Sequence, residues 1–306
     1  MYKLDDLLIC YNWMPLVADH VIDFPPEYYT DSIYNINRLY DKETDKEMIE
    51  PDDVKNMKEN DIIFVKTDFI VNGHFTNHWL DKIETPFNLI TAVSSYQVGH
   101  DGSDPNSYKK ILENKYLKNW FCTNPPNEEH EKIHPLPIGF SEPDRPSANQ
   151  NILKKLRKER KPFEEKINRL FIPWHNQTTN PDRHAIINSL KDKEYVDMMQ
   201  DKSEIESYMK KMGDYRYTIC VQGCGNDTHR NYEALLMGCV IITIDCTVKR
   251  LFDKYNLPGH FVNDWSEVND EFFERISTQE YDFSNVEAFL QVKTHADEIK
   301  KICGKS

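Results

Sequence analysis

The chain has 306 residues, enough for two domains with a substantial core, and its formal net charge at pH 7 is −13. This acidity excludes nonspecific binding to nucleic acid, which requires a positive surface, and it should repel anionic membranes. Aromatic residues make up 12% of the chain, and because disordered chains lack such material for a core, the composition indicates a soluble globular protein.

The chain is expected to work in a reducing compartment and without a membrane anchor. Its 7 cysteines are odd in number and irregularly spaced, which is typical of free thiols rather than of a disulfide framework. Cys220 and Cys224 lie close together, but no second pair with zinc-like spacing accompanies them. Residues 1–15 carry early acids and no long apolar segment, unlike a signal peptide, and no apolar run reaches transmembrane length. These features predict a cytoplasmic protein.

The first half of the chain is predicted to form a parallel α/β domain. Residues 1–60 predict little beyond a strand over 7–11. Apolar runs then predict strands over 62–65, 87–93, 120–122 and 133–138, with helices over 75–83 and 108–113. Strands that alternate with helices indicate a parallel sheet. Residues 141–166 contain Pro143, Pro146 and a dense charged run, and they are interpreted as the connection between two domains.

The second half repeats this alternation. Apolar runs predict strands over 170–174, 217–221, 240–244 and 260–262. Helices are predicted from Pro181 and over 228–237, 249–255, 269–276 and 286–302. The predicted domains are therefore residues 1–165 and 166–306, both α/β, and the last helix is free to pack back on the first domain.

The most informative stretch runs from Tyr217 to Cys246. An apolar run is followed by a glycine-containing loop over 223–227, a segment with helical spacing and a second apolar run, which is the order of a βαβ unit. The helix start is well marked, because Asn226, Asp227 and Thr228 are all favourable N-cap residues. Gly238 suits the left-handed position that ends such a helix.

The beginning of this helix has the chemistry of an anion site. His229, Arg230 and Glu233 are expected to gather there, at the carboxyl end of the preceding strand, where open α/β sheets bind ligands. Free N–H groups, the helix dipole and the planar fork of an arginine together favour an anion such as a diphosphate. Glu233 is placed one turn further on to accept hydrogen bonds from ribose hydroxyls.

The same residues also admit a purely structural interpretation. A glycine loop that leads into a helix occurs as plain connection, and Arg230 with Glu233 would then be an ordinary surface pair at i,i+3 spacing. Local chemistry leaves both interpretations open.

The stretch from Gly225 to Asp245, GNDTHRNYEALLMGCVIITID, resembles the donor-site motif of exostosin-like glycosyltransferases. In that family a glycine-rich turn leads to an arginine, an aromatic–Glu–Ala–Leu run, Gly-Cys and an apolar strand. Further segments are similar to the family's "WF-x-x-N" and "PIG" motifs and to parts of its second domain: residues 120–124, 137–140, 179–183 and 264–268. The family often has proline where Val240 or Ile241 stands.

The resemblance implies a GT-B fold, with two Rossmann-like domains whose parallel sheets face each other across a cleft. It implies transfer of a sugar from a nucleotide-sugar donor, expected to be a UDP-sugar, to a glycan or other hydroxyl acceptor. The domain 1–165 would face the acceptor and the domain 166–306 would bind the donor. The sequence contains no Asp-x-Asp, so neither a divalent metal nor another cofactor is expected, and cationic side chains and helix N-termini should neutralise the diphosphate.

On this resemblance Arg230 is the first choice for the diphosphate, and Asn180 and Arg183 are weaker choices. Arg183 is equally compatible with a surface position on a helix. The remaining donor-binding candidates surround the helix start: Glu233, His229, Thr228, Asp227 and Gly225.

An inverting reaction needs a base for the acceptor hydroxyl, and the first domain should supply it. Asp101 is favoured, followed by His100, because both lie in the loop over 94–104 that follows the strand over 87–93, and Asp68 comes next, at the end of the strand over 62–65. Gly99 and Gly102 beside Asp101 leave room for an acceptor, although aspartate and glycine also suit a simple turn.

Two other function classes compete with a transferase. A noncatalytic carbohydrate- or nucleotide-binding protein would keep the fold without turnover. A dinucleotide oxidoreductase is disfavoured, because the loop over 223–228 lacks the third glycine of G-x-G-x-x-G.

Overall fold

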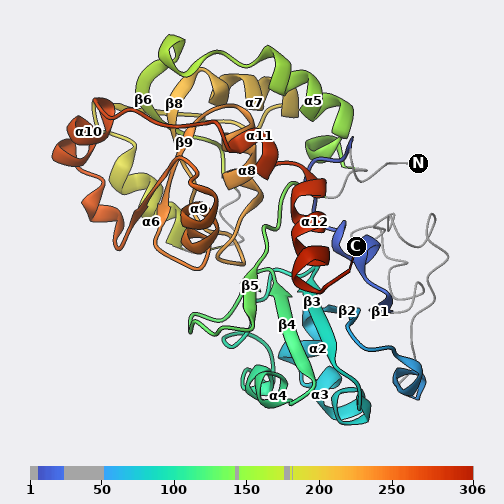
Figure 1. The fold of residues 1–306 in the computed structure, drawn as a ribbon. Helices are drawn as coiled ribbons and strands as arrows, with labels where there is room; N and C mark the ends of the chain where they lie inside the picture. Colours follow the sequence, from blue (N-terminus) through green and yellow to red (C-terminus); the bar gives the residue numbers. More distant parts are fainter. Residues whose placement is uncertain (1–5, 24–51, 142–144, 176–179, 181, 306) are drawn as a thin grey trace. The chain divides into compact units, whose positions relative to one another are not determined.

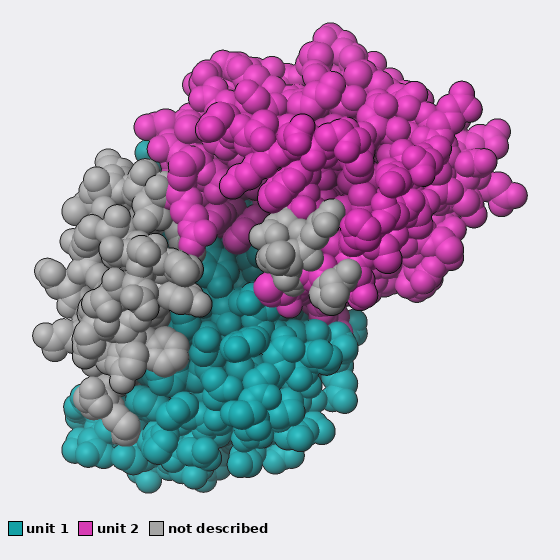
Figure 2. Space-filling model, turned by 180° about the vertical axis from the view of Figure 1, so that it is seen from behind, with its two compact units in different colours: residues 1–138, 291–306 teal, residues 139–290 magenta. Residues whose placement is uncertain are grey.

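The computed structural model describes residues 6–23, 52–141, 145–175, 180 and 182–305 (Figure 1). The chain divides into two compact units, coloured separately in Figure 2. Unit 1 comprises residues 1–138 and 291–306, and unit 2 comprises residues 139–290. Residues 139–165, assigned above to the first domain, therefore lie in unit 2, and the C-terminal 16 residues of the second predicted domain lie in unit 1, counting from 291 to 306.

Unit 1 is built on a parallel sheet whose strands follow the order of the chain, β1-β2-β3-β4-β5. The strands are β1 His20–Ile22, β2 Asp61–Lys66, β3 Phe87–Ala92, β4 Leu117–Cys122 and β5 Ile133–Pro135. Every residue of β2 and β3 is buried, as expected for central strands of a parallel sheet that is covered on both faces. The strands predicted over 62–65, 87–93 and 120–122 are thus confirmed, and the strand predicted over 133–138 is shorter, ending at Pro135.

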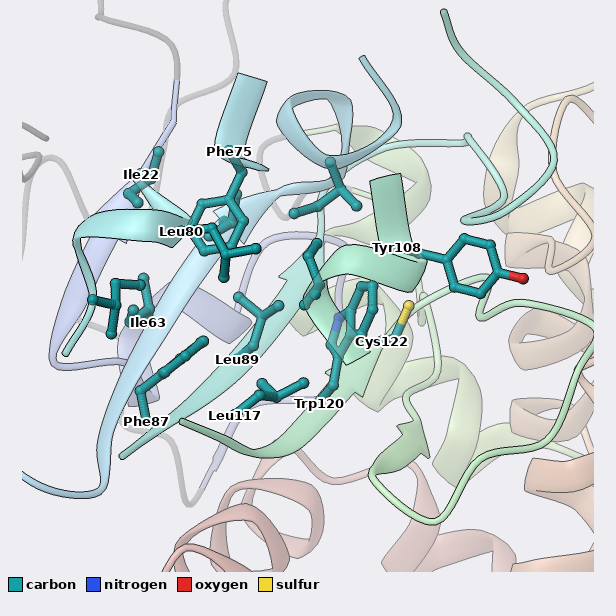
Figure 3. Packing of buried hydrophobic residues seen from close by; sticks show 14 of the residues in the cluster. Ile22, Ile63, Phe75, Leu80, Phe87, Leu89, Tyr108, Leu117, Trp120 and Cys122 are labelled. Carbon is teal, nitrogen blue, oxygen red and sulfur yellow. The ribbon is translucent and has the colours of Figure 1, made fainter. Parts of the chain in front are cut away.

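Short helices cover one face of this sheet. They are α2 Thr67–Val71, α3 His74–His78, the 3-10 turn η5 Leu80–Lys82 and α4 Ser107–Glu113. Right-handed crossovers between strands that run in one direction across a sheet all fall on the same face. Figure 3 shows the resulting core, where Phe75 and Leu80 from the helical side pack with Ile63, Leu89 and Trp120 from the strands.

The end of the chain joins unit 1. The Val292 N–H donates to the Leu7 carbonyl at 2.8 Å, and Leu8 forms an isolated bridge with Gln291. The predicted strand over 7–11 is therefore wrong, since this segment forms only single bridges. It leads into the 3-10 turn η2 Met14–Val17, and Figure 1 shows it beside the last helix, α12 Val292–Ile302.

The single helix predicted over 286–302 is also wrong. It is two helices, α11 Val286–Phe289 in unit 2 and α12 in unit 1. Gln291 has an extended backbone with φ −93° and ψ 133°, which its bridge to Leu8 requires, and this interrupts the helix. The amphipathic pattern continues across the break, so the sequence pattern concealed it.

Unit 2 contains a second five-stranded parallel sheet, in the order β10-β9-β8-β6-β7. Its strands are β6 Ile167–Ile172, β7 Val196–Met198, β8 Tyr215–Ile219, β9 Val240–Ile244 and β10 Gly259–Val262. Its helices and 3-10 turns are η6 Pro146–Ala148, α5 Gln150–Glu159, η7 Phe163–Glu165, α6 Asp182–Leu190, α7 Ile205–Gly213, α8 His229–Leu236, α9 Lys249–Tyr255, η8 Trp265–Glu267, α10 Asp270–Ser277 and α11. Unit 1 also contains the 3-10 turn η4 Asp53–Asn56, which precedes β2.

The strand order of unit 2 reverses at β6. The chain moves from β6 outward to β7, crosses back to β8 on the other side of β6, and continues through β9 to β10. The connection through α6 and those through α7 and α8 consequently lie on opposite faces. Ile187 and Leu190 of α6 share a core with Phe272 and Ile276 of α10, whereas α7 packs against α8. The carboxyl ends of β6 and β8 thus flank a topological switch point, where open α/β sheets bind ligands.

The fold class predicted from the sequence, two α/β units that are each built on a parallel sheet, is confirmed. Within the described ranges, none of the helices is long and apolar enough to cross a bilayer.

Candidate functional site

The start of α8 lies at the switch point of unit 2. Thr228 has an extended backbone, with φ −133° and ψ 147°, and occupies the N-cap position. Its hydroxyl makes no capping bond, and its Oγ1 is buried without a hydrogen-bond partner among the described residues. Gly238 has φ 69° directly after the helix, as predicted. The helix is therefore ended by glycine, while its beginning retains an unsatisfied buried hydroxyl.

The Asp227 carboxylate turns into the helix. It accepts hydrogen bonds from the Asn231 amide, at 3.0 Å, and from the Tyr232 hydroxyl. Asp227 is buried, and so is Gly225 in the same loop. These contacts tie the glycine loop to the first turn of α8, so Asp227 fixes the loop through its side chain instead of capping the helix.

Arg230 lies at the centre of the site and is not a surface residue. Its Nη2 donates to the Trp174 carbonyl at 3.2 Å, and its Nε lies 3.5 Å from Glu233 Oε2. Its guanidinium stacks on the Tyr208 ring, with 5.0 Å between the Cζ atom and the ring centroid. Burial alone would lower the pKa of Arg230, but the neighbouring Tyr208 and Glu233 raise it, so the side chain remains a cation. Nη1 is buried and has no hydrogen-bond acceptor in the described parts of the chain.

Arg183 is buried beside this group, which contradicts the surface position considered for it. Its Nε donates to the Gln222 carbonyl at 2.8 Å, and the Asn180 amide reaches the same oxygen at 3.4 Å. The pKa of Arg183 is lowered, first by burial and then by the positive charge of Arg230. The structure thus brings two predicted arginines together at the carboxyl ends of β6 and β8. Asn180 shares the Gln222 carbonyl with Arg183 as a hydrogen-bond acceptor.

His175 belongs to the same group, and the sequence analysis did not select it. Its Nδ1 lies 2.6 Å from the Pro173 carbonyl and must carry a proton there, so Nε2 is an acceptor. That Nε2 is buried and unpartnered among the described residues. Burial, and next the charges of Arg230 and Arg183, lower the pKa of His175 to about 2. The available signal was its place directly after a strand at the ligand-binding edge.

Glu233 is more enclosed than its predicted role suggests. The residue is 8% exposed, and its Oε2 accepts the Tyr208 hydroxyl at 2.8 Å besides facing Arg230. His229 Nδ1 lies 2.8 Å from the carbonyl of Gly139, which belongs to the "PIG"-like segment. The structure therefore brings two of the motifs together: the start of α8 and the segment around Gly139.

Several buried polar atoms at this edge lack partners among the described residues, and each follows a strand: His175 Nε2 after β6, Thr228 Oγ1 and Arg230 Nη1 after β8, and Thr247 Oγ1 after β9. Leaving a buried donor or acceptor unpaired costs about 1–3 kcal/mol, and more for a charged group. Their concentration at a switch point, around two guanidinium groups, indicates a place where a ligand supplies the missing partners.

In unit 1 the predicted base candidates divide into two environments. Asp101 Oδ2 accepts the Gln97 N–H at 2.6 Å, and Oδ1 lies 2.9 Å from His100 Nδ1. The side chains of His100 and Asp101 therefore contact each other. The Asp101 carboxylate also stabilises the turn over 97–101, which is the structural role that the sequence left open for it. Gly99 and Gly102 have φ 81° and 87°, so both serve the turn.

Asp68 is differently placed. It lies in the first turn of α2, directly after β2, and its Oδ2 is 3.9 Å from Lys66 Nζ. This oxygen is buried and has no hydrogen-bond partner within the described chain. At the end of the adjacent strand β3, Val93 has φ 60°, a strained conformation for a β-branched residue. The edge of unit 1 around Asp68 therefore combines an unsatisfied carboxylate with strained backbone.

Metal-ligating residue types do not gather in the described ranges. No group of three or more His, Cys, Asp or Glu side chains there could hold a metal ion. His74 and His78 stack with their ring centroids 5.5 Å apart and with no third ligand among those residues. None of the seven cysteines, all of which lie in the described ranges, forms a disulfide, and Cys224 alone among them is exposed.

Comparison with known proteins adds little to this description. No family model matches the chain, and no curated protein matches its sequence. Among solved structures it is similar to the UDP-GlcNAc 2-epimerase from Methanocaldococcus jannaschii, at 12% identity and a TM-score of 0.34, covering 79% of this chain and 76% of that chain. It is also similar to a chain of the GtfA/B complex, at 9% identity and a TM-score of 0.42, covering 82% of this chain and 59% of that chain. Similarity at this level carries no argument about function.

Proposed function

We propose that this protein is a glycosyltransferase of the exostosin-like type, which uses a nucleotide-sugar donor and a hydroxyl-bearing acceptor such as a glycan. The observation that supports it best is the pair Arg183 and Arg230 at the switch point, surrounded by unpartnered buried polar atoms. Such a group suits a diphosphate, whose oxygens accept from guanidinium groups and from a helix N-terminus. The resemblance of the α8 motif supplies the reaction class, with a UDP-sugar as the expected donor.

In this proposal Arg230 holds the diphosphate and neutralises the charge that develops on it as the glycosidic bond breaks. Nη1 is the free edge of its guanidinium, and Thr228 Oγ1 and the first turn of α8 supply neighbouring donors. Arg183 strengthens the positive potential from the α6 side. Cationic side chains then take the part that a divalent metal plays elsewhere, so transfer should persist in the presence of EDTA.

The base for the acceptor hydroxyl is proposed in unit 1. The sequence favoured Asp101, but both of its oxygens are engaged by Gln97 and His100. Asp68 retains an oxygen without a hydrogen bond to any described residue, and we place it first, ahead of Asp101 and His100. An inverting reaction with one carboxylate as base is the expected mechanism.

The test has two stages. Calorimetric titration with UDP and a panel of nucleotide sugars should identify a donor, and binding should raise the thermal midpoint by mass action. Release of UDP from that donor, with and without acceptor and in EDTA, should then show turnover. Absence of binding to every nucleotide, nucleotide sugar and pyrophosphate would contradict the proposal. Donor binding without turnover under any acceptor would instead favour the noncatalytic binding protein.

A further inference from the structure

Three side chains from two helices form a closed arrangement beside the proposed phosphate site. Tyr208, on α7, donates its hydroxyl to Glu233 Oε2 at 2.8 Å, and that oxygen lies 3.5 Å from Arg230 Nε. The Tyr208 ring in turn lies under the Arg230 guanidinium, at 5.0 Å from Cζ to the centroid. Each member of the group therefore contacts the other two.

The arrangement is enclosed, so its contacts are not loosened by water. Tyr208 and Glu233 are each 8% exposed. Burial, and next the nearby Glu233 carboxylate, hold the pKa of Tyr208 well above its ordinary value against the opposing charge of Arg230. The hydroxyl consequently keeps its proton and remains a donor. Met212 Sδ, at 3.6 Å, is the other acceptor within its reach, but a carboxylate is much the stronger one.

The contacts fix one guanidinium orientation. Glu233 faces the Nε edge of Arg230, and the Trp174 carbonyl accepts a hydrogen bond from Nη2. The Tyr208 ring stacks on one face of the guanidinium. Nη1 has no acceptor among the described residues, and Nε, which faces Glu233 at ion-pair distance, makes no hydrogen bond to them either. An arginine held in this way presents a preset donor to an anion and loses little side-chain entropy when the anion binds.

We propose that Tyr208 is a positioning residue for the phosphate-binding arginine and acts on Arg230 through Glu233. The inference rests on the proposed function and deepens it, because it changes the role of Glu233. Through Oε2 that carboxylate orients the arginine, a role additional to the ribose contact that its place in the motif suggested. The motif's Glu and Arg then work as one unit, completed by a tyrosine from another helix.

The first test is Tyr208→Phe, which removes the hydroxyl and keeps the ring under the guanidinium. Inorganic pyrophosphate and UDP are the probes, because pyrophosphate requires only the anion site. Loss of one net hydrogen bond in the positioning chain should weaken both by about 3- to 10-fold. Tyr217→Phe is the matched control, since it also removes a buried hydroxyl, one that donates to the Ile276 carbonyl at 2.8 Å. That variant should bind as the wild type does, and an unchanged affinity in Tyr208→Phe would overturn the inference.

A double-mutant cycle separates positioning from general packing. In an Arg230→Lys background there is no guanidinium fork left to orient, so adding Tyr208→Phe should cause little further loss of affinity. A loss as large as in the wild-type background would show that Tyr208 does not act through Arg230. Glu233→Gln provides a second variant with an intact tyrosine and should weaken pyrophosphate binding in the same direction.

A ligand-free measurement keeps this inference separate from the proposed function. In a nitrogen-15 spectrum the Arg230 Nε–H resonance, identified by its absence in Arg230→Lys, should exchange slowly with water in the wild type. It should broaden or exchange faster in Tyr208→Phe and not in Tyr217→Phe. An unaltered resonance in Tyr208→Phe would overturn the positioning role. A wild type that binds neither UDP nor pyrophosphate would overturn the proposed function, whatever the spectrum shows.

Discussion

The two units have sheets of the same kind and very different edges. Each sheet has five parallel strands, but those of unit 1 follow the chain in order, whereas those of unit 2 reverse at β6. In unit 1 the helices α2, α3 and α4 contact one another on one face, so the connections do not diverge there. In unit 2 they diverge between β6 and β8, and Arg183 and Arg230 donate hydrogen bonds between the segments that follow these two strands.

The chemistry of the two edges follows this difference. The divergence in unit 2 is lined by Arg183, Arg230 and His175. Several buried polar atoms there have no hydrogen-bond partner among the described residues. At the edge of unit 1 the Asp101 carboxylate is used to close a loop, and Asp68 is the proposed exception. A parallel sheet alone therefore does not indicate where a ligand binds, and the order of its strands does. The comparison leads us to expect donor binding in unit 2 and proton transfer in unit 1.

The largest expected effect concerns this division of roles. Asp68→Asn should lower turnover by about 10²- to 10⁴-fold, the usual contribution of general base catalysis, and leave donor affinity nearly unchanged. Asp101→Asn is the matched control, because it makes the same change on the neighbouring loop of unit 1. Steady-state kinetics together with calorimetry measure both quantities. A larger loss in Asp101→Asn would return the base to the residue that the sequence favoured.

The next effect concerns the unit 2 edge itself. Arg230→Ala should weaken UDP binding by at least about tenfold, since a charge-assisted hydrogen bond contributes about 1.5–3 kcal/mol. Arg157→Ala is a suitable control, because the Arg157 side chain is 22% exposed, against 19% for Arg230, but pairs with Glu287 at 3.2 Å on another part of unit 2. Equal UDP affinity in Arg230→Ala and the wild type would show that the arginines are structural.

The buried histidine of unit 2 should be visible in the pH dependence of stability. The pKa of His175 is lowered from 6.5 to about 2, so as the pH falls below 6.5 the unfolded chain takes up a proton that the folded chain does not. The free energy of unfolding should therefore fall with decreasing pH, by about 1.4 kcal/mol per pH unit for this one group. His175→Gln should reduce that slope in chemical denaturation between pH 6 and pH 4, as judged against the wild type.

His260 gives an internal comparison for the same experiment. Its pKa is lowered to about 4, chiefly by burial, so His260→Gln should flatten the slope only above that value. An identical slope in His175→Gln and the wild type would mean that His175 is protonated in the folded protein.

The smallest expected effect uses a natural reporter at the edge of unit 2. Cys224 is the exposed thiol of the seven and lies between Gly223 and Gly225, so a thiol reagent should label it first. At a UDP concentration of twice Kd about a third of the protein is free, and the labelling rate should fall by about threefold. Cys224→Ser should remove the fast phase. A rate that does not respond to UDP would separate this loop from the binding site.

The sequence by itself determined many local elements of both units, although it indicated neither β1, β7 nor α7. Continuous apolar runs identified β2, β3, β8 and β9, because strands buried on both faces lack polar alternation. Gly238 marked the end of α8, since a left-handed residue is required there. These features depend on residues that are neighbours in the chain, and the motif around Arg230 was recognisable for the same reason.

Only the tertiary structure decided which edge has a switch point and what surrounds the motif. The reversal at β6 depends on pairing between distant strands, and no local pattern encodes it. Tyr208 meets Glu233 across 25 residues of sequence, and Trp174 meets Arg230 across 56. The break at Gln291 likewise arises from a bridge to Leu8, at the other end of the chain. Such contacts depend on how helices and strands pack, and packing is a property of the whole fold.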